Sequence, residues 1–238
     1  MNDIDKLKIA IMKSNNIVCL TGAGVSTESG IKDFRGKDGI SKYTDIPIEV
    51  LISRSYFDSN TEEFYEYYKK CFNCLDKEPN ITHKFLKKLE KSGKLKAVIT
   101  QNVDGLDVKA GCKNVLELHG SIYRNHCMKC GKSYTAEEVF NAKGVPKCSC
   151  KGIIKPDVVL YEEPLPDGII DRAIEYIRNA DLFLILGTSL VVYPAAGLVR
   201  YFKGDTLAII NYDETGYDYT ADIVIHDKLS NVIDKIMI

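Results

Sequence analysis

The stretch TGAGVSTESGIKDFRG, Thr21–Gly36, decides the fold, and the apolar run Ile17–Leu20 leads straight into it. An apolar run followed at once by glycines predicts a buried strand that ends in a tight turn. The first two glycines let the backbone turn and leave bare N–H groups open to a phosphate. Ser26 and Thr27 can cap a helix whose positive end faces the same anion. The stretch therefore predicts a phosphate-binding loop.

The glycine spacing departs from the usual dinucleotide fingerprint. After Gly22 and Gly24, the third glycine of G-x-G-x-x-G would fall at Thr27, whereas the next glycine is Gly30. A G-x-G pair alone also fits an ordinary turn between a strand and a helix. Asp33–Arg35 argues for more than a turn, because an acid, an aromatic and a base stand where loops usually carry small polar residues.

Composition excludes several classes of function. The chain has 238 residues, with 32 basic and 33 acidic side chains and a net charge of −1, which gives no electrostatic grip on nucleic acid or membrane. The N-terminal residues 1–13 mix charges in an amphipathic pattern that is not typical of a signal peptide. The uncharged stretch Leu182–Val199 contains Gly187 and Pro194, so it reads as a strand, a loop and a helix start. We expect a cytoplasmic protein.

Apolar runs and helical patterns alternate along the rest of the chain. The predicted strands after the first are Ala97–Ile99, Val115–Leu118, Val158–Leu160, Leu182–Leu186 and Leu207–Ile210. The predicted helices are 1–16, 80–90, 167–179 and 195–201. This alternation predicts an α/β fold, a Rossmann-like doubly wound parallel sheet.

Two segments interrupt the pattern. Residues 37–80 are rich in aromatics and helical, and residues 121–156 carry a group of cysteines. We expect a discontinuous Rossmann-like NAD-binding domain of residues 1–36, 81–120 and 157–238, with a helical insertion at 37–80 and a small zinc-binding module at 121–156.

Four of the eight cysteines form two close pairs, Cys127-x-x-Cys130 and Cys148-x-Cys150. Paired thiolates suit one tetrahedral Zn²⁺ ion, and four protein ligands leave no open position, so the expected role is structural. The alternative is four unrelated thiols. His126 adjoins the first pair and is not expected to be a ligand. Cys71 and Cys74 also have ligand spacing, but they are interpreted as one helix face.

His119 is the main candidate for chemistry. It follows an apolar strand, and Asn102 and Asp104 follow the neighbouring one. Ligands bind at the carboxyl ends of strands in parallel sheets, and an imidazole titrates near neutral pH. A structural histidine is the alternative interpretation.

These motifs together resemble the sirtuins, the NAD-dependent protein deacylases. The family signature GAG-x-S-x-x-SGI-x-DFR is met from Gly22 to Arg35, and the motifs TQN-x-D, LHG and GTS follow in order. The resemblance runs from about Ile17 to Asn211. It implies an NAD-dependent protein-lysine deacetylase that yields nicotinamide, deacetylated lysine and O-acetyl-ADP-ribose, with an acetyl-lysine protein or peptide as partner.

The resemblance also implies roles for single residues. NAD is the co-substrate, and Asn102 positions its ribose while Asp104 holds the nicotinamide carboxamide. Phe34 shields the reacting C1′ carbon. The full set implied to bind NAD is Gly22, Ala23, Gly24, Ser26, Thr27, Asp33, Phe34, Arg35, Gln101, Asn102, Val103, Asp104, His119, Gly187, Thr188, Ser189 and Asn211.

An unactivated amide is a poor nucleophile, so a route through NAD must first make C1′ electrophilic by expelling nicotinamide. The acyl oxygen then attacks C1′. A neutral imidazole can take a proton from the ribose hydroxyls, so that the 2′-hydroxyl attacks the resulting imidate carbon. His119 is the predicted base, and Asn102 is its predicted catalytic partner.

The predicted peptide-binding segment is Val158, Val159, Leu160 and Tyr161, where the family pattern VV-x-FGE stands. A substrate peptide adds there as a β-strand. Glu162 replaces the usual glycine, which is expected to alter docking or favour basic flanking residues. In the insertion, Tyr65 and Tyr68 stand where succinyl-preferring members carry tyrosine and arginine.

Two other functions stay open. A mono-ADP-ribosyltransferase or a long-chain deacylase could use the same scaffold. A zinc-stabilised module that binds NAD or ADP-ribose without turnover is the third possibility, because Glu162 and Asp107 depart from the family pattern.

Overall fold

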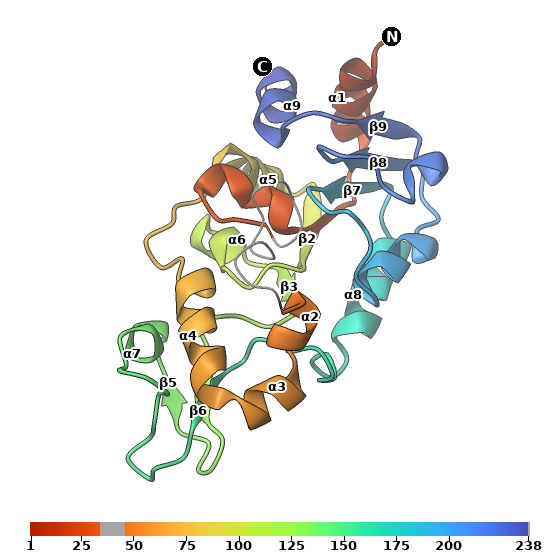
Figure 1. Ribbon diagram of the computed structural model, residues 1–238. Coiled ribbons are helices and arrows are strands. Elements are labelled where there is room, and N and C mark those ends of the chain that lie inside the picture. Colours follow the sequence, from red (N-terminus) through yellow and green to blue (C-terminus); the bar gives the residue numbers. More distant parts are fainter. Residues whose placement is uncertain (34–45, 238) are drawn as a thin grey trace.

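The computed structural model describes residues 1–33 and 46–237, so Phe34 and Arg35 lie outside the described residues. Its centre is a six-stranded, fully parallel sheet with the order β3-β2-β1-β7-β8-β9 (Figure 1). The strands are β1 Ile17–Thr21, β2 Leu95–Thr100, β3 Val115–Glu117, β7 Leu182–Leu186, β8 Thr206–Ile210 and β9 Ile223–Ile225. The predicted Rossmann-like fold is confirmed.

The two central strands are buried on both faces. Every residue of β1 and of β7 is buried, and the two strands pair from Ile17 opposite Leu182 to Thr21 opposite Leu186. Continuous apolar runs of this kind belong to parallel strands covered by helices on each side.

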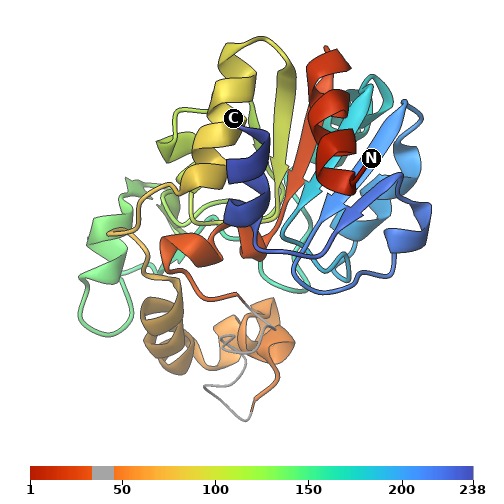
Figure 2. The ribbon, with the colours of Figure 1, turned by 90° about the horizontal axis from the view of Figure 1, so that it is seen from above.

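Helices cover the sheet in two layers. The helices α1 Asp3–Lys13, α5 Ile81–Lys91 and α9 Leu229–Ile236 lie side by side over one face (Figure 2). The opposite face packs against α8 Ile169–Arg178 and the 3₁₀ helix η4 Ala195–Tyr201. No helix among residues 1–33 and 46–237 is long and apolar enough to cross a membrane.

The strand order reverses between β1 and β7. The chain runs from β1 towards β2 and β3 on one side, and from β7 towards β8 and β9 on the other. Loops that leave the carboxyl ends of two such strands diverge and open a crevice, which is where ligands bind in doubly wound sheets. The loops in question begin at Gly22 and Gly187.

The two interruptions of the pattern pack on each other. The short helices α2 Ile48–Leu51, α3 Arg54–Ser59 and α4 Thr61–Phe72 form the first, and a small antiparallel sheet with α7 Ala136–Phe140 belongs to the second. The strands of the small sheet are β4 Asn125–Cys127, β5 Ser133–Tyr134 and β6 Ile154–Pro156.

An aromatic cluster joins α4 to the small sheet and α7. Tyr68 stacks on Phe64, Phe72 and Phe140, with ring centroids 5.7, 5.1 and 5.4 Å apart. The Tyr65 hydroxyl donates a hydrogen bond to the carbonyl of Ile154. Tyr65 and Tyr68 are both 1% exposed. They are packing residues in a core shared by the insertion and the small sheet, and they do not line the cleft described below.

Several predicted elements differ from the structure. The predicted strand Val158–Leu160 is wrong, because this segment has no regular structure, and Val158 and Leu160 are buried with Phe57 in the core that the helical insertion shares with the small sheet. The predicted helix at 195–201 is a 3₁₀ helix. Cys71 and Cys74 do not share a helix face, because α4 ends at Phe72. The edge strand β9 was not predicted, because three residues carry too short an apolar signal.

Asp107 is the one buried carboxylate of the short helix α6, Leu106–Lys109. It is 3% exposed, and burial, followed by the negative charge of Asp104, raises its pKa to about 7. The hydroxyls of Thr100 and Thr21 partly oppose that rise. Asp107, which departs from the family pattern, is therefore a buried carboxyl group that stays protonated at acidic pH.

This carboxyl group makes stability depend on pH. The unfolded chain ionises Asp107 near its ordinary pKa of 3.8, whereas the folded chain keeps the proton to about pH 7. The contribution of Asp107 to the free energy of unfolding is complete below the unfolded pKa. It is lost as the pH rises through the folded pKa, by up to about 1.4 kcal/mol per pH unit. The substitution Asp107→Asn should remove this dependence. Urea unfolding of both proteins from pH 5 to 8 measures it.

The comparison uses the difference between the two curves, so that other titrating groups cancel. Asp171→Asn, an exposed carboxylate on α8, controls for the change in net charge. A difference between wild type and Asp107→Asn that stays constant across this pH range would show that Asp107 is ionised in the folded protein.

Candidate active site

A large cleft lies at the reversal point of the sheet. Its volume is about 1360 Å³, and it extends from the carboxyl ends of β1 and β7 to the helical insertion. Of the residues predicted to bind cofactor or peptide, those lining it are Gly22, Ala23, Gly24, Thr27, Asp33, Gln101, Asn102, Val103, His119, Val158, Val159, Leu160, Tyr161, Gly187, Thr188, Ser189 and Asn211. Ser26 and Asp104 lie behind this wall and are buried.

The floor of the cleft is formed by two glycine loops in backbone contact. A Cβ atom added at Gly22 would lie 2.7 Å from the Gly187 carbonyl oxygen, and one at Gly24 would lie 2.8 Å from the Gly187 Cα. The amides of Gly22 and Gly24 donate to the carbonyls of Leu186 and Gly187 at 3.1 and 2.8 Å. The glycines are required because two loops approach closely, and their N–H groups are not bare, which corrects the expectation from the sequence.

Ser26 does not cap a helix. The chain after Gly22 forms two single 3₁₀ turns, Ala23–Val25 and Thr27–Ser29, and neither has a side-chain cap. The Ser26 hydroxyl instead donates to Asp104 Oδ2 at 2.6 Å. The Leu106 amide donates to Asp104 Oδ1 at 2.8 Å. Oδ2 of this buried carboxylate thus ties the loop after β2 to the loop after β1, and Oδ1 fixes the turn into α6.

His119 lies at the end of β3 with one nitrogen engaged. Its Nδ1 is 2.9 Å from the carbonyl oxygen of Gln101. A carbonyl only accepts, so Nδ1 carries the proton and Nε2 keeps its lone pair. Burial lowers the pKa of His119 below 6.5, and the bond to Gln101 opposes this shift. The imidazole at the cleft is therefore neutral near pH 7.

The loop after β2 is oriented by its neighbours. The Asn102 side-chain amide donates to the Gly22 carbonyl at 3.0 Å. The Gln101 side-chain amide donates to the Thr188 hydroxyl at 3.0 Å. The loop after β2 is thus bonded to the loops after β1 and β7, which brings residues 80 or more positions apart to one surface.

The outer cleft contains residues that the sequence did not single out. Val191, Val192 and Tyr193 line it after the Gly187–Ser189 loop, and Ile48, Ile52 and Phe72 line it from the helical insertion. The uncharged run after Gly187–Ser189 was the available signal. The residues of the insertion carried none, because their place depends on long-range packing.

The predicted metal ligands come together. The sulfur atoms of Cys127, Cys130, Cys148 and Cys150 all lie within 4.8 Å of one another. Cys127 and Cys150 are 3.5 Å apart, and Cys130 and Cys148 are 3.6 Å apart. Tetrahedral Zn–S bonds of about 2.3 Å place sulfur atoms about 3.8 Å apart, so the four thiols fit one zinc ion.

The shortened pair Cys148-x-Cys150 fits this geometry, and the strained backbone lies at the next residue. Lys151 follows Cys150 with φ 65°, and its amide donates to the Cys148 carbonyl. A Cβ atom at Gly152 would lie 2.7 Å from the Cys127 sulfur, so glycine is needed there. His126 is outside the group and contacts Asp157, with 2.5 Å between Nδ1 and Oδ1. The cysteines are not part of the cleft lining.

Sequence comparisons give close relatives over the whole chain. A protein of Clostridium acetobutylicum named NAD-dependent protein deacetylase is 50% identical over 242 residues, with 100% of this chain and 99% of that protein covered. A protein of Clostridium perfringens with the same name is 52% identical over 240 residues, with 98% of each covered.

Solved structures agree. A Sir2 protein with a deacetylated p53 peptide and 3′-O-acetyl ADP ribose has a TM-score of 0.91 at 38% identity, covering 100% of this chain and 98% of that one. A Sir2 complex with p53 peptide and NAD+ has a TM-score of 0.87 at 37% identity, covering 98% and 97%. The Sir2 family sequence model matches residues 22–194, and this chain belongs to the Sir2 family.

Proposed function

We propose that this protein removes acetyl groups from lysine side chains of proteins, with NAD as co-substrate. The products are nicotinamide, the deacetylated lysine and O-acetyl-ADP-ribose. Relatives that share half of its sequence are named NAD-dependent protein deacetylases. The expected partner is an acetyl-lysine-containing protein or peptide.

The observation that carries the proposal is the state of His119. It presents a neutral imidazole to the cleft, with Nδ1 bound to a carbonyl and Nε2 available as a base. NAD supplies an electrophilic C1′ carbon when nicotinamide leaves. His119 takes the proton from a ribose hydroxyl at Nε2. Asn102, whose amide group is anchored on the Gly22 carbonyl, positions that ribose.

The two glycine loops and their neighbours hold NAD in this account. Ala23, Thr27 and the Gly187–Ser189 loop line the floor, and Asn211 lines the end near β8. Asp104 acts from behind the wall, where burial raises its pKa and Ser26 hydrogen-bonds it. Nicotinamide recognition through Asp104 then requires its hydrogen bond to Ser26 or to Leu106 to be shared or exchanged. Phe34 and Arg35 complete the proposed set.

The acyl-lysine peptide enters across the outer cleft. Val158–Tyr161 and Val191–Tyr193 both line it, which gives an extended peptide two chain segments to bind. The apolar side chains of Ile48, Ile52 and Phe72 then give the acyl group an apolar surface in the same cleft as His119.

The zinc ion has a structural role in this proposal. Its four thiols leave no open position, and no cysteine lines the cleft. The division into a Rossmann-like domain of residues 1–36, 81–120 and 157–238, a helical insertion at 37–80 and a zinc module at 121–156 follows from these roles. Reduced thiolate ligands favour the cytoplasm.

Replacing His119 tests the assigned base. His119→Ala should lower kcat for an acetyl-lysine peptide by about 10²- to 10⁴-fold, the usual contribution of a general base. The Kd for NAD, measured by calorimetry, should stay within a few fold, because the glycine loops are untouched.

His126→Gln is the matched control, since this histidine also has its Nδ1 engaged by an oxygen atom, from the Asp157 carboxylate, but lies outside the cleft. It should keep the wild-type rate. Turnover by His119→Ala at more than a tenth of the wild-type rate would remove His119 from the mechanism.

Removing zinc tests the structural role of the cysteines. Cys130→Ser should release the single zinc ion, lower the melting temperature and open residues 121–156 to proteolysis. Cys71→Ser removes a thiol outside the group and should retain one zinc per chain. Elemental analysis and limited proteolysis give the readouts. A zinc-free protein with full activity and an unchanged melting temperature would contradict the assignment.

A further inference from the structure

Glu162 adopts a conformation that a side chain disfavours. Its φ is 75°, in the left-handed region, where a Cβ atom crowds the following carbonyl oxygen. Glycine, the family residue predicted for this position, carries no such cost. Only Lys151 and Leu190 share this feature among non-glycine residues of the described chain. The free-energy cost of this backbone conformation must therefore be offset by contacts of the folded chain, among them those of the Glu162 carboxylate.

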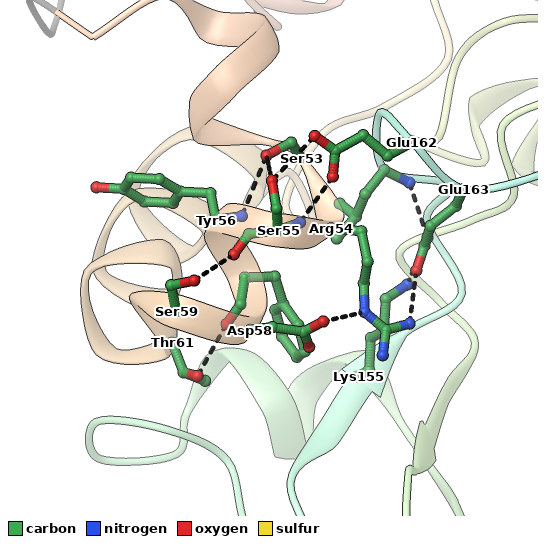
Figure 3. Close-up of polar contacts among 12 residues, drawn as sticks. Ser53, Arg54, Ser55, Tyr56, Asp58, Ser59, Thr61, Lys155, Glu162 and Glu163 are labelled. Atoms are coloured by element: carbon green, nitrogen blue, oxygen red, sulfur yellow. Dashed lines mark hydrogen bonds and ion pairs between the residues drawn. The ribbon is translucent and has the colours of Figure 1, made fainter.

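Its carboxylate is bound by a single residue of the helical insertion. The Ser55 amide donates to Glu162 Oε2 at 2.8 Å, and the Ser55 hydroxyl donates to Oε1 at 2.9 Å (Figure 3). Ser55 lies in the first turn of α3, where an amide has no partner within the helix. Bonds of this type to an ionised acceptor are the stronger ones. In the described part of the chain, no cation lies within ion-pair distance of Glu162.

The backbone beside Glu162 is tied to the same helix start. The Tyr161 amide donates to the Ile52 carbonyl at 3.0 Å, and the Arg54 amide donates to the Tyr161 carbonyl at 3.0 Å. Ser53 and Tyr161 form an isolated parallel bridge. These contacts attach the carboxyl end of the segment Val158–Tyr161 to the helical insertion.

Glu163 extends the connection to the small sheet. The Arg54 guanidinium is 3.3 Å from Glu163 Oε1, and the buried Lys155 ammonium is 2.9 Å from Oε2 (Figure 3). Lys155 belongs to β6. Arg54 also pairs with Asp58 at 2.8 Å. Arg54 and Lys155 thus both pair with Glu163, and among residues 1–33 and 46–237 the Glu162 carboxylate is bound by Ser55 alone.

We propose that Glu162 is a positioning residue that acts through Ser55 to hold the peptide-binding segment against the helical insertion. This inference rests on the proposed deacetylase function. Ile52, Tyr161, Glu162 and Glu163 line one wall of the same cleft. If the segment were free, only part of the population would present that wall, and the apparent affinity for peptide would fall by that fraction. The hydrogen bonds of Ser55 keep the wall preformed.

Steady-state kinetics of five variants with an acetyl-lysine peptide test the proposal. Glu162→Gly removes both bonds while relieving the backbone, and it should raise the peptide KM about three- to tenfold, the range of a surface charge-assisted pair. The kcat and the KM for NAD should stay within twofold. Glu162→Gln keeps an acceptor for the amide and a donor for the hydroxyl, so it should restore most of the peptide KM.

Ser55→Ala removes one of the two bonds, so its effect should be smaller, and its addition to Glu162→Gly should raise the KM no further. Ser59→Ala is the matched control, because the Ser59 hydroxyl bonds to the Ser55 carbonyl within α3 and Ser59 does not line the cleft. A peptide KM unchanged in Glu162→Gly would overturn the proposal. A Glu162→Gln variant as impaired as Glu162→Gly would assign the effect to charge.

Hydrogen exchange separates this proposal from the function on which it rests. Glu162→Gly should accelerate amide exchange at Ser55 and at Tyr161 whether or not the protein turns over. If the wild-type protein showed no NAD-dependent deacetylation but exchange were still faster in Glu162→Gly, the deacetylase function would be contradicted. The role of Glu162 in holding the segment would stand. Unchanged exchange at both amides would show that Glu162 does not hold the segment.

Discussion

The close contact between the loops after β1 and β7 is the constraint on which the site depends. Gly22 and Gly24 meet Gly187 at distances that admit no side chain, and two backbone hydrogen bonds join them. The strand order diverges at this point, so the loops would otherwise separate. Asn102 and Gln101 then bond to these loops and bring the end of β2 to the same surface. The cleft is therefore built by backbone contacts before any ligand arrives.

The chemistry of His119 follows from this frame. The backbone carbonyl of Gln101 accepts a hydrogen bond from Nδ1 of His119, and the side chain of the same residue donates to the Thr188 hydroxyl. Burial disfavours the charged imidazole and keeps it a base near neutral pH. The zinc module and the helical insertion share an aromatic core, and the insertion lines the cleft through Ile48, Ile52 and Phe72. Glu162 and Ser55 lie where these parts meet.

Much of this arrangement could be predicted from the sequence, because it rests on short motifs. The strand Leu182–Leu186 and the cysteine group are recognisable from runs and spacing alone, and the structure has both. The contacts of Ser26 with Asp104 and of Glu162 with Ser55 were not predictable, because they join residues 78 and 107 positions apart. The segment Val158–Leu160 misled for a related reason. Val158 and Leu160 are buried in the core shared by the helical insertion and the small sheet, without strand pairing, and periodicity does not distinguish the two.

The most direct test of the account is mass spectrometry of the products formed from an acetyl-lysine peptide, with and without NAD. The account predicts loss of the acetyl group only when NAD is present, with nicotinamide and O-acetyl-ADP-ribose formed in equal amounts. Free acetate without O-acetyl-ADP-ribose, or ADP-ribose retained on the peptide, would contradict it, because either product would mean that the acyl oxygen does not attack C1′ in this cleft.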